Sequence, residues 1–513
     1  MKTIESFGRP ALPAMNLGRR GTFRWGVSTV LGLSGLLLPV AAQDFFPSVN
    51  PFAVPQDPAL QQELQENRMM KALESQAIAA SKGSQLGNYN IKLGPVLAWF
   101  RAGLMFRYQS NFNLVSSDNP SAAPEGNFTI GPAISGSLRY DISEKARIVL
   151  STGLSYQWSL NNNQDQLVIS PSSALDYQFS IGEVNFSVFN NTASASTATT
   201  DPTISGTGDS SLMNFNRVSN STGMGAGWQP YRDTTVSGAY AFLINRGLGN
   251  DNFNQFNRNT QTFNLAVQQA LSPVWTVGLS SQGNIINYLP ISIQTSTNAP
   301  ATQQRVQNDS HGWGVGPTAT WRATQFIVVN ALVNYTVQTY EQDSVVQDST
   351  DFSGVTFNVS MDHTINPYLS QTISGGRSVN PGNGSNFTEI TTMGYRLQWQ
   401  IMPVLALTGT FRFNQFDQSG GGFAYFPYVP GAPLPPNFAY ITDDDIVVVK
   451  VANGQQGQQY VFTLGTGYDL SEKLSLGVNY SVAIRDTTNQ SIDNVIFGSY
   501  LTQSVVVSLA YKF

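Results

Sequence analysis

The last thirteen residues, 501–513, read LTQSVVVSLAYKF, and they alternate between two kinds of side chain. The odd positions are mostly large and apolar, namely Leu501, Val505, Val507, Leu509, Tyr511 and Phe513. The even positions are mostly small or polar, as at Thr502, Ser504 and Ser508. Because successive side chains of a strand point to opposite faces, this segment predicts a β-strand with one face suited to lipid and the other to water.

The same period of two recurs along the chain in segments that are long for a soluble sheet. Residues 474–485 read LSLGVNYSVAIR, and residues 148–158 and 327–335 repeat the pattern. Strands in soluble proteins are usually about 5 to 6 residues long. A strand that crosses a membrane needs roughly 9 to 11 residues at its tilt. The lengths therefore favour membrane strands.

Short and long polar connectors alternate between these segments, as they do in transmembrane β-barrels. Short turns are expected at Asp141–Lys145, Ile181–Glu183, Gln229–Asp233, Leu271–Pro273, Arg322–Gln325, Thr364–Pro367, Ile401–Pro403 and Leu470–Lys473. With one more strand near 99–112 and a last one at 500–513, the pattern predicts an all-β, antiparallel up-and-down barrel of about 18 strands. Sixteen is the alternative, because 218–229 and 367–379 alternate less cleanly.

Aromatic residues gather at the predicted strand ends, where membrane barrels carry interfacial girdles. Those near the short turns are Tyr140, Trp228, Tyr231, Trp275, Trp321, Tyr368, Trp399 and Tyr468; those near the long connectors are Trp158, Tyr288, Tyr340 and Phe416. Two girdles facing the membrane are expected, with core packing as the alternative role.

The composition excludes several functional classes. Only 12% of residues are charged, against about 25% in soluble domains. There is no cysteine, which removes disulfides, thiolate metal sites and thiol nucleophiles. The net charge of −5 argues against nucleic acid as a partner. The two histidines, His311 and His363, fall on different predicted strands near opposite ends, so an enzyme is not expected, and neither is a cofactor or a resident metal.

The N-terminal region is expected to be separate from the barrel. Residues 1–42 resemble a cleaved signal peptide, with Arg19, Arg20 and Arg24 before an apolar run from Val27 to Val40; Met15 is an alternative start. The sequence of residues 43–88 predicts a Pro-rich linker followed by a periplasmic helix over 57–82. This helix is expected to plug the barrel or to assist trimerisation, and the alternative is that the segment is a loosely ordered extension. The barrel is assigned to 89–513, and Ile91–Ala98 is expected to add a short hairpin arm.

A signal peptide, alternating strands and a C-terminal strand ending in Phe513 resemble the Gram-negative outer-membrane β-barrel proteins, particularly the porin-like families. The resemblance covers about residues 99–513. It implies a bacterial outer-membrane location, contact with membrane lipid and a homotrimer as one arrangement. It also implies that the last strand, at Val505, Val507, Leu509, Tyr511 and Phe513, is read by the barrel-assembly machinery.

Arginines dominate the face predicted to point inward, with few carboxylates beside them. These candidate pore-lining residues are Arg101, Arg107, Arg139, Arg377, Arg396, Arg412 and Arg485. Since a low-dielectric wall focuses such charge, the lumen is expected to favour anions or acidic solutes. The alternative is that the arginines pair with loop acids such as Asp343, Asp351 and Asp443–Asp445 and hold the loops; the two roles can coexist.

The longest connector, 418–456, is expected either to constrict the mouth or to form a surface hairpin through Ile446–Val451, with the surface preferred. Loop 195–217 is an equal candidate for folding inward. The functional prediction is a channel for passive diffusion of small polar or anionic solutes, because 16 to 18 strands usually enclose an aqueous lumen. The alternative is a sealed barrel with a surface, adhesion or polysaccharide-export accessory role.

Overall fold

The structure is a computed structural model that describes residues 91–111, 126–143, 145–161, 165–170, 173–196, 216–247, 257–294, 301–342, 344–345, 348–382, 385–420, 422–427, 438–442, 446–451, 456–487 and 499–513. These residues contain strands and connections and no helix. No helix within these ranges is therefore long and apolar enough to span a membrane. The predicted signal peptide, linker and helix lie outside the described residues.

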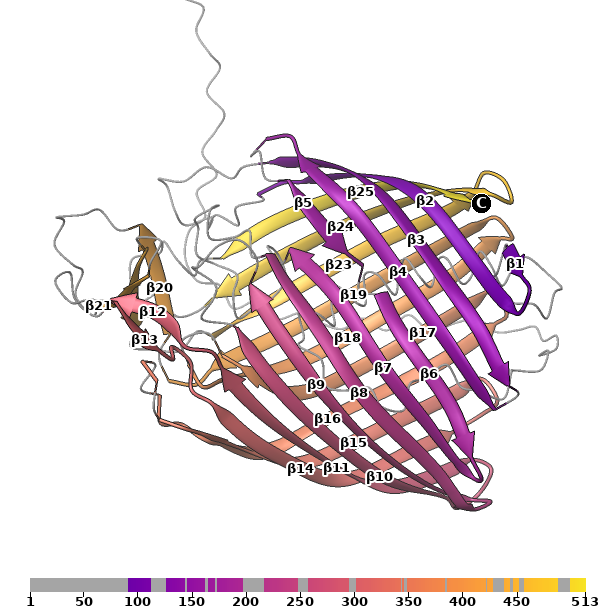
Figure 1. The fold of residues 1–513 in the computed structure, drawn as a ribbon, viewed down its shortest axis with the longest axis horizontal. Coiled ribbons are helices and arrows are strands. Elements are labelled where there is room, and N and C mark those ends of the chain that lie inside the picture. The colour runs from indigo at the N-terminus through magenta and orange to yellow at the C-terminus, as the bar shows by residue number, and fades with distance from the viewer. Residues whose placement is uncertain are drawn as a thin grey trace, which may run out of the picture. The chain divides into compact units, whose positions relative to one another are not determined.

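A closed ring of antiparallel strands forms the molecule's main sheet (Figure 1). Two of its 20 strands, β1 (Ile91–Leu93) and β5 (Gln166–Ile169), are short additions, which leaves 18 strands in the wall. The wall strands, in ring order, are β2 (Val96–Gln109), β3 (Asn127–Ser143), β4 (Ala146–Ser159), β6 (Ser173–Ile181), β7 (Val184–Ser196), β8 (Asn216–Tyr231), β9 (Thr234–Gly247), β10 (Arg258–Ala270), β11 (Trp275–Tyr288), β14 (Ser310–Arg322), β15 (Ile327–Tyr340), β16 (Phe352–Asn366), β17 (Leu369–Pro381), β18 (Phe387–Met402), β19 (Leu405–Gln418), β23 (Gln456–Asp469), β24 (Leu474–Thr487) and β25 (Tyr500–Lys512).

The ring closes where the last strand pairs with the first. β25 runs antiparallel to β2 from Arg101↔Lys512 to Gln109↔Ser504, so that neither strand is left with an open edge. Closure is what allows a sheet to cross lipid, since an unpaired backbone N–H or C=O has no partner there. The predicted count of 18 is confirmed over 16, because both weakly alternating segments are wall strands, β8 and β17.

All eight predicted short turns join neighbouring strands at one end of the barrel. Four of them adjoin a register shift, for example between Asp141 and Ser143 in β3 and between Gln400 and Met402 in β18. The predicted arm is confirmed as well: β1 pairs with the start of β2, from Ile91↔Ala98 to Leu93↔Val96, around Gly94 at φ +61°. At the other end one connector is shorter than expected, because only 382–386 joins β17 to β18.

Two Gly-Pro pairs interrupt the hydrogen-bonded ladder inside strands. The β3–β4 pairing skips Gly131 and Pro132, and the β14–β15 pairing skips Gly316 and Pro317. Proline has no N–H to donate to a ladder. The paired glycine lets the neighbouring backbone come close: a Cβ at Gly316 would clash with the carbonyl of Val333.

The long connectors contribute a second, five-stranded sheet. It contains β12 (Ile291–Gln294) and β13 (Thr302–Gln304) from one connector and β20 (Gly422–Pro427), β21 (Phe438–Thr442) and β22 (Ile446–Val451) from another. β12 pairs with β21 through Ile293↔Thr442 and Gln294↔Ile441. The hairpin expected through Ile446–Val451 therefore exists, with β22 between β20 and β21.

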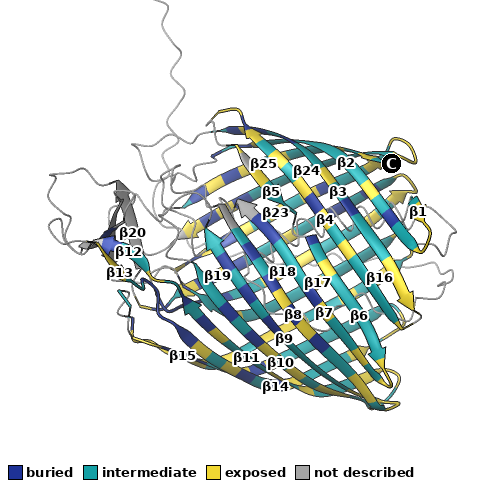
Figure 2. Cartoon of the chain, in the orientation of Figure 1, coloured by how far each residue is buried: buried dark blue, intermediate teal, exposed yellow. Residues whose placement is uncertain are grey.

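Exposed and less exposed residues alternate along the wall strands (Figure 2). Exposed large hydrophobic side chains share one face, such as Leu150, Leu154 and Trp158 on β4, and this face is the outer, membrane-facing one. The aromatic residues expected near the short turns are all exposed on it, and Trp158 is too. The prediction is wrong for Tyr288, Tyr340 and Phe416, which lie on the inner face and are buried.

Candidate functional site

The inner wall of the barrel is the candidate site, and it is mostly polar. On the strands' inward positions towards the long connectors, most buried side chains are hydroxyls and amides, for example Asn127, Thr129, Ser221, Thr262, Asn334 and Asn414. Such residues are too polar for the core of a soluble sheet, where inner faces are apolar. An inner face of this kind is typical of barrels that enclose water.

Strand register places six of the seven predicted arginines on this inner wall. Arg101 and Arg107 of β2 lie opposite Lys512 and Val506 of β25, on the face away from Tyr511 and Leu509. Arg396, Arg412 and Arg485 lie inward on β18, β19 and β24. We call Arg101, Arg107, Arg396, Arg412 and Arg485 the arginine face. It occupies six consecutive wall strands, from β18 across the closure to β2.

Arg139, the sixth, lies inward on β3 close to a short turn. Its Nε donates to Asp141 Oδ1 over 3.0 Å, and both side chains are partly exposed. An ion pair with this much solvent contact contributes little to stability. It neutralises the arginine locally, so Arg139 is set apart from the arginine face.

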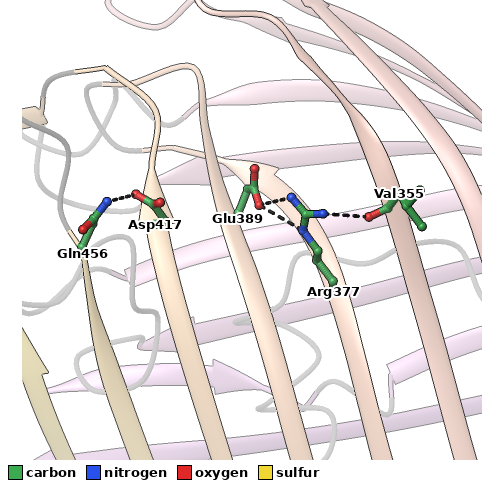
Figure 3. Close-up of polar contacts among 5 residues, drawn as sticks. All are labelled: Val355, Arg377, Glu389, Asp417 and Gln456. Atoms are coloured by element: carbon green, nitrogen blue, oxygen red, sulfur yellow. Dashed lines mark hydrogen bonds and ion pairs between the residues drawn. The ribbon is translucent and has the colours of Figure 1, made fainter.

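Arg377 lies on the opposite face from the one predicted. It is paired with Phe357 and Thr391 and shares its face with Ile373, so it points outward. Its guanidinium forms an ion pair with Glu389 and donates to the Val355 carbonyl over 3.3 Å (Figure 3). In β17, which reads LSQTISGGRSVNP, Ile373 and Val379 share the face of Arg377, so the alternation itself indicates an outward side chain and the inward assignment went against it.

A row of hydrogen-bonded side chains crosses the inner wall beside Arg485. Thr392 Oγ1 donates to Asn414 Oδ1 over 3.1 Å, and Asn414 Nδ2 donates to Gln459 Oε1 over 3.1 Å. The register continues this row to Arg485, whose Cζ lies 4.5 Å from the centre of the Phe416 ring. Sequence reasoning missed these residues, because only register brings four strands into one row.

Two arginines of the arginine face each have one guanidinium nitrogen without a hydrogen-bond partner. The Nε atoms of Arg107 and Arg396 are buried and have no hydrogen-bond partner. The inward carboxylates on the described wall strands are Asp141, Asp176, Asp362 and Asp469. Arginine guanidinium groups are well suited to binding carboxylates and phosphates. Cationic groups therefore dominate this side of the inner wall.

Four connectors are tied together at the end opposite the short turns. Asp348 Oδ2 accepts from the Asn386 N–H and from Ser419 Oγ, each over 2.9 Å, and Oδ1 accepts from the Thr350 N–H over 2.9 Å. Asn308 Nδ2 donates to Asn386 Oδ1 over 2.7 Å. We call Asp348, Asn308, Thr350, Asn386 and Ser419 the Asp348 network.

The pKa of Asp348 is set by two opposing effects. Burial raises it, but the hydrogen bonds from Asn386, Thr350 and Ser419 stabilise the carboxylate, and the net pKa lies below the ordinary value. The network therefore contains an ionised aspartate at neutral pH.

Of the loop acids expected to pair with arginines, only Asp351 lies within the described residues. Asp351 accepts a hydrogen bond from the Tyr340 N–H over 2.9 Å. Asp343 and Asp443–Asp445 lie outside the described residues, as do most of loop 195–217 and parts of connector 418–456. Ion pairs among the described residues include Asp309 with Arg305, Glu389 with Arg377 and Asp141 with Arg139.

The two histidines both face outward. His311 is exposed on β14 beside Ile285, and His363 on β16 is paired with Ile327 near a short turn. His363 Nδ1 lies 3.0 Å from Gln371 Nε2. Neither imidazole faces the lumen. Across the described ranges, no group of three or more His, Asp or Glu side chains could hold a metal ion.

No protein-family model matches the sequence, and no curated protein matches it either. Solved structures with some similarity include Acinetobacter baumannii OccAB3, at 9% identity and a TM-score of 0.39, over 81% of this chain and 99% of that one. Pseudomonas aeruginosa OpdQ is 8% identical with a TM-score of 0.39, over 82% and 98%. Pseudomonas aeruginosa OpdK, solved with vanillate, is 8% identical with a TM-score of 0.40, over 81% and 99%.

The architecture itself rests on this chain's own strand pairing. An even number of antiparallel strands closes into a ring, short turns lie at one end, and apolar side chains cover the outer face. These are the properties of bacterial outer-membrane barrels. The chain therefore has the fold of an 18-stranded β-barrel of the bacterial outer-membrane type.

Proposed function

We propose that the protein is a channel for passive diffusion of small polar solutes, with a preference for anions. The observation that carries the proposal is the polar inner wall with its arginine face. Barrels of 16 to 18 strands usually leave an aqueous channel. Cations on a low-dielectric wall raise the local concentration of anions, because field lines are focused into the lumen. No cofactor or reaction enters this function.

Ion selectivity tests the proposal. In planar bilayers with a salt gradient, the reversal potential of the wild-type protein should indicate anion preference. Arg107→Ala and Arg396→Ala should shift it towards zero, because each removes an inward positive charge. Arg377→Ala is the matched control, since Arg377 faces outward, and it should leave the reversal potential unchanged. A cation-selective channel, or equal effects of all three variants, would contradict the proposal.

Assembly is proposed to depend on the last strand. Val505, Leu509, Tyr511 and Phe513 are exposed on the outer face, and Val507 shares that face through its pairing with Phe106. An apolar stripe that ends at the chain terminus is a feature that the barrel-assembly machinery can bind while the barrel is still open. The homotrimer suggested by the sequence stays a prediction.

A further inference from the structure

Two strands in succession, β6 and β5, fill one place in the wall between β4 and β7 (Figure 1). β6 lies along residues 146–151 of β4, and β5 lies along residues 154–157. Between them, the Ser170 N–H donates to the Gly153 carbonyl over 2.8 Å, and the Gly153 N–H donates to Ser173 Oγ over 3.0 Å. A Cβ at Gly153 would clash with the Ser170 side chain. The strand next to β4 is therefore interrupted at the level of Gly153.

β7 is paired with β6 but not with β5. The β6–β7 pairing ends at Ser173↔Thr192, and residues 193–196 of β7 pair with β8 only. Within the part of the chain that the structure describes, β5 likewise pairs with β4 only, although it lies beside β7. The Ile169 N–H donates to the Ser194 hydroxyl over 2.5 Å instead of to a backbone carbonyl of β7. We call residues 166–169 and 193–196 the β5–β7 seam.

The seam lies within the membrane-spanning part of the wall. On β4, Ile148 pairs with Tyr140 of the girdle near the short turns, and the exposed Trp158 is ten residues further along. This spacing matches the roughly 9 to 11 residues that a membrane strand needs. β5 pairs with residues 154–157, so the seam lies between the two levels and closer to Trp158. It therefore faces the half of the membrane next to the long, extracellular connectors.

A comparable interruption between β16 and β17 is bridged by large side chains. The pairing of these two strands stops at Phe357↔Arg377, before their ends near the long connectors. Beyond that point the Arg377 guanidinium donates to the Val355 carbonyl over 3.3 Å (Figure 3). The Phe352 ring packs edge-on against Phe387, with 5.4 Å between ring centres. An ion-paired arginine and an aromatic cluster therefore hold β16 and β17 together where the ladder is missing.

Small side chains line the β5–β7 seam instead. Ala193 is 6% exposed and Ser194 is 5% exposed, so the seam is closed in this structure. Parting β5 from β7 breaks the Ile169–Ser194 hydrogen bond, whereas parting two laddered strands would leave a row of backbone groups in lipid without partners. The β4–β5 and β7–β8 ladders flank the seam, and the β6–β7 ladder continues on its short-turn side. The barrel can therefore stay closed as a ring while the seam opens.

The two faces of the wall beside the seam differ in polarity, and this difference selects a class of solute. On the lumen side, β4 presents Ser155 and Gln157. On the lipid side, Leu154 is 47% exposed and Leu167 is 60% exposed. A purely polar solute would lose its hydrogen bonds on leaving the lumen for lipid, and a purely apolar one would not enter the polar lumen. A molecule with one polar group and one apolar chain suits both sides.

We infer that the β5–β7 seam opens as a lateral exit, through which small amphiphiles pass between the lumen and the outer half of the membrane. The inference rests on the proposed aqueous lumen and adds a second way out of it. Polar solutes and ions keep to the lumen, so the exit changes which molecules the barrel transports and leaves its ion conductance as it is. Opening separates Ile169 from Ser194 and requires no other strand pair to part.

A disulfide across the seam tests the inference, since the chain has no cysteine of its own. Ile169→Cys with Ser194→Cys closes the seam on oxidation, and dithiothreitol reopens it. The probe is dodecanoate carrying a fluorescent nitrobenzoxadiazole group, whose emission rises when it enters lipid. In intact cells, incorporation of the probe should be faster with the wild-type protein than without it. Oxidation of the seam pair should lower this protein-dependent rate at least fivefold, and dithiothreitol should restore it.

Gln261→Cys with Ile285→Cys is the matched control. These residues are directly paired across the complete β10–β11 ladder. Ile285 is ten residues beyond the start of its strand at Trp275, as Ser194 is beyond the start of β7. Oxidation of this pair should leave probe incorporation unchanged. Heat-modifiable migration on gels establishes that both double variants are folded.

Conductance in planar bilayers separates the exit from the channel. The oxidised seam pair should conduct ions as the wild-type protein does. A wild-type protein that conducts but adds nothing to probe incorporation would overturn the exit and leave the channel in place. Equal loss of incorporation from both disulfides, or loss of conductance together with incorporation in the seam pair, would also overturn it. Absence of conductance from the wild-type protein would overturn the proposed channel and this inference with it.

Discussion

At Gly316 the barrel wall has no room for a side chain. A Cβ there would clash with the Val333 carbonyl and the Asn334 backbone, and backbone atoms held in a ladder cannot move aside cheaply. We expect Gly316→Ala to destabilise the folded barrel by about 1–3 kcal/mol, the usual cost of overpacking. Urea titration in detergent or lipid, followed by heat-modifiable migration, measures this.

Gly409→Ala is the control for that prediction, because a Cβ at Gly409 meets nothing within 4 Å. It should be neutral, or stabilising by up to about 1 kcal/mol, since alanine restricts the unfolded chain more than glycine does. If both substitutions cost the same, close packing at the Gly-Pro break is not the cause.

The face of the barrel on which a residue lies could be predicted from the sequence at some positions and not at others. Alternation assigns a residue to a face wherever apolar markers flank it, as around Arg485 in β24, and there the prediction is right. The prediction was wrong at Arg377, where Ile373 and Val379 share the arginine's face and alternation indicates an outward side chain. Tyr288, Tyr340 and Phe416 were misplaced for another reason: towards the long connectors the interior is packed, so a buried aromatic on the inner face becomes favourable.

Among the connectors, the Asp348 network makes a prediction about pH. The pKa of Asp348 is lowered in the folded protein. A lowered carboxylate pKa gives stabilisation that is fully present above the unfolded value, about 3.9, and is lost as pH falls through the lower folded value. The connectors should therefore stay closed at pH 5–7 and loosen only under stronger acid. Limited proteolysis across this pH range checks it.

Asp348→Ala should make connectors 341–351 and 382–386 sensitive to protease at neutral pH, since three donors lose their acceptor. Asp486→Ala is the control. Asp486 is exposed and accepts from Ser499 Oγ over 3.0 Å, so its loss should leave those connectors protected. Equal cleavage of both variants would contradict a special role for Asp348.

The last strand carries the element-scale prediction about assembly. Removal of Phe513 should lower the yield of folded barrel in cells severalfold, because the terminal ring packs edge-on against Tyr511 at 5.4 Å and ends the apolar stripe. Lys512→Ala, on the inner face of the same strand, should have little effect. Folded yield is measured by heat-modifiable migration of outer-membrane fractions, and equal yields would count against the stripe as a signal.

Turns and strands were predictable because their signals are local: a Pro or Gly cluster, or ten residues of alternation. The Asp348 network and the five-stranded sheet were not, because their members come from connectors far apart in the chain. β12 and β21, for example, pair residue 293 with residue 442, and no local pattern encodes such a partner.

At the scale of the whole molecule, the closed barrel and the proposed channel rest on different features of the structure. The strand count and the shared end of the short turns establish a closed barrel. The channel depends on the inner wall, where arginines from β2, β18, β19 and β24 gather although they are distant in sequence. Closure places the first strand beside the last and so completes the arginine face.

Conductance of the purified full-length protein in planar bilayers tests the central claim most directly. An open barrel should give discrete conductance steps that scale with salt concentration, as expected for a water-filled lumen. A folded, heat-modifiable protein that inserts into the bilayer and gives no steps would contradict the channel and identify a sealed barrel instead.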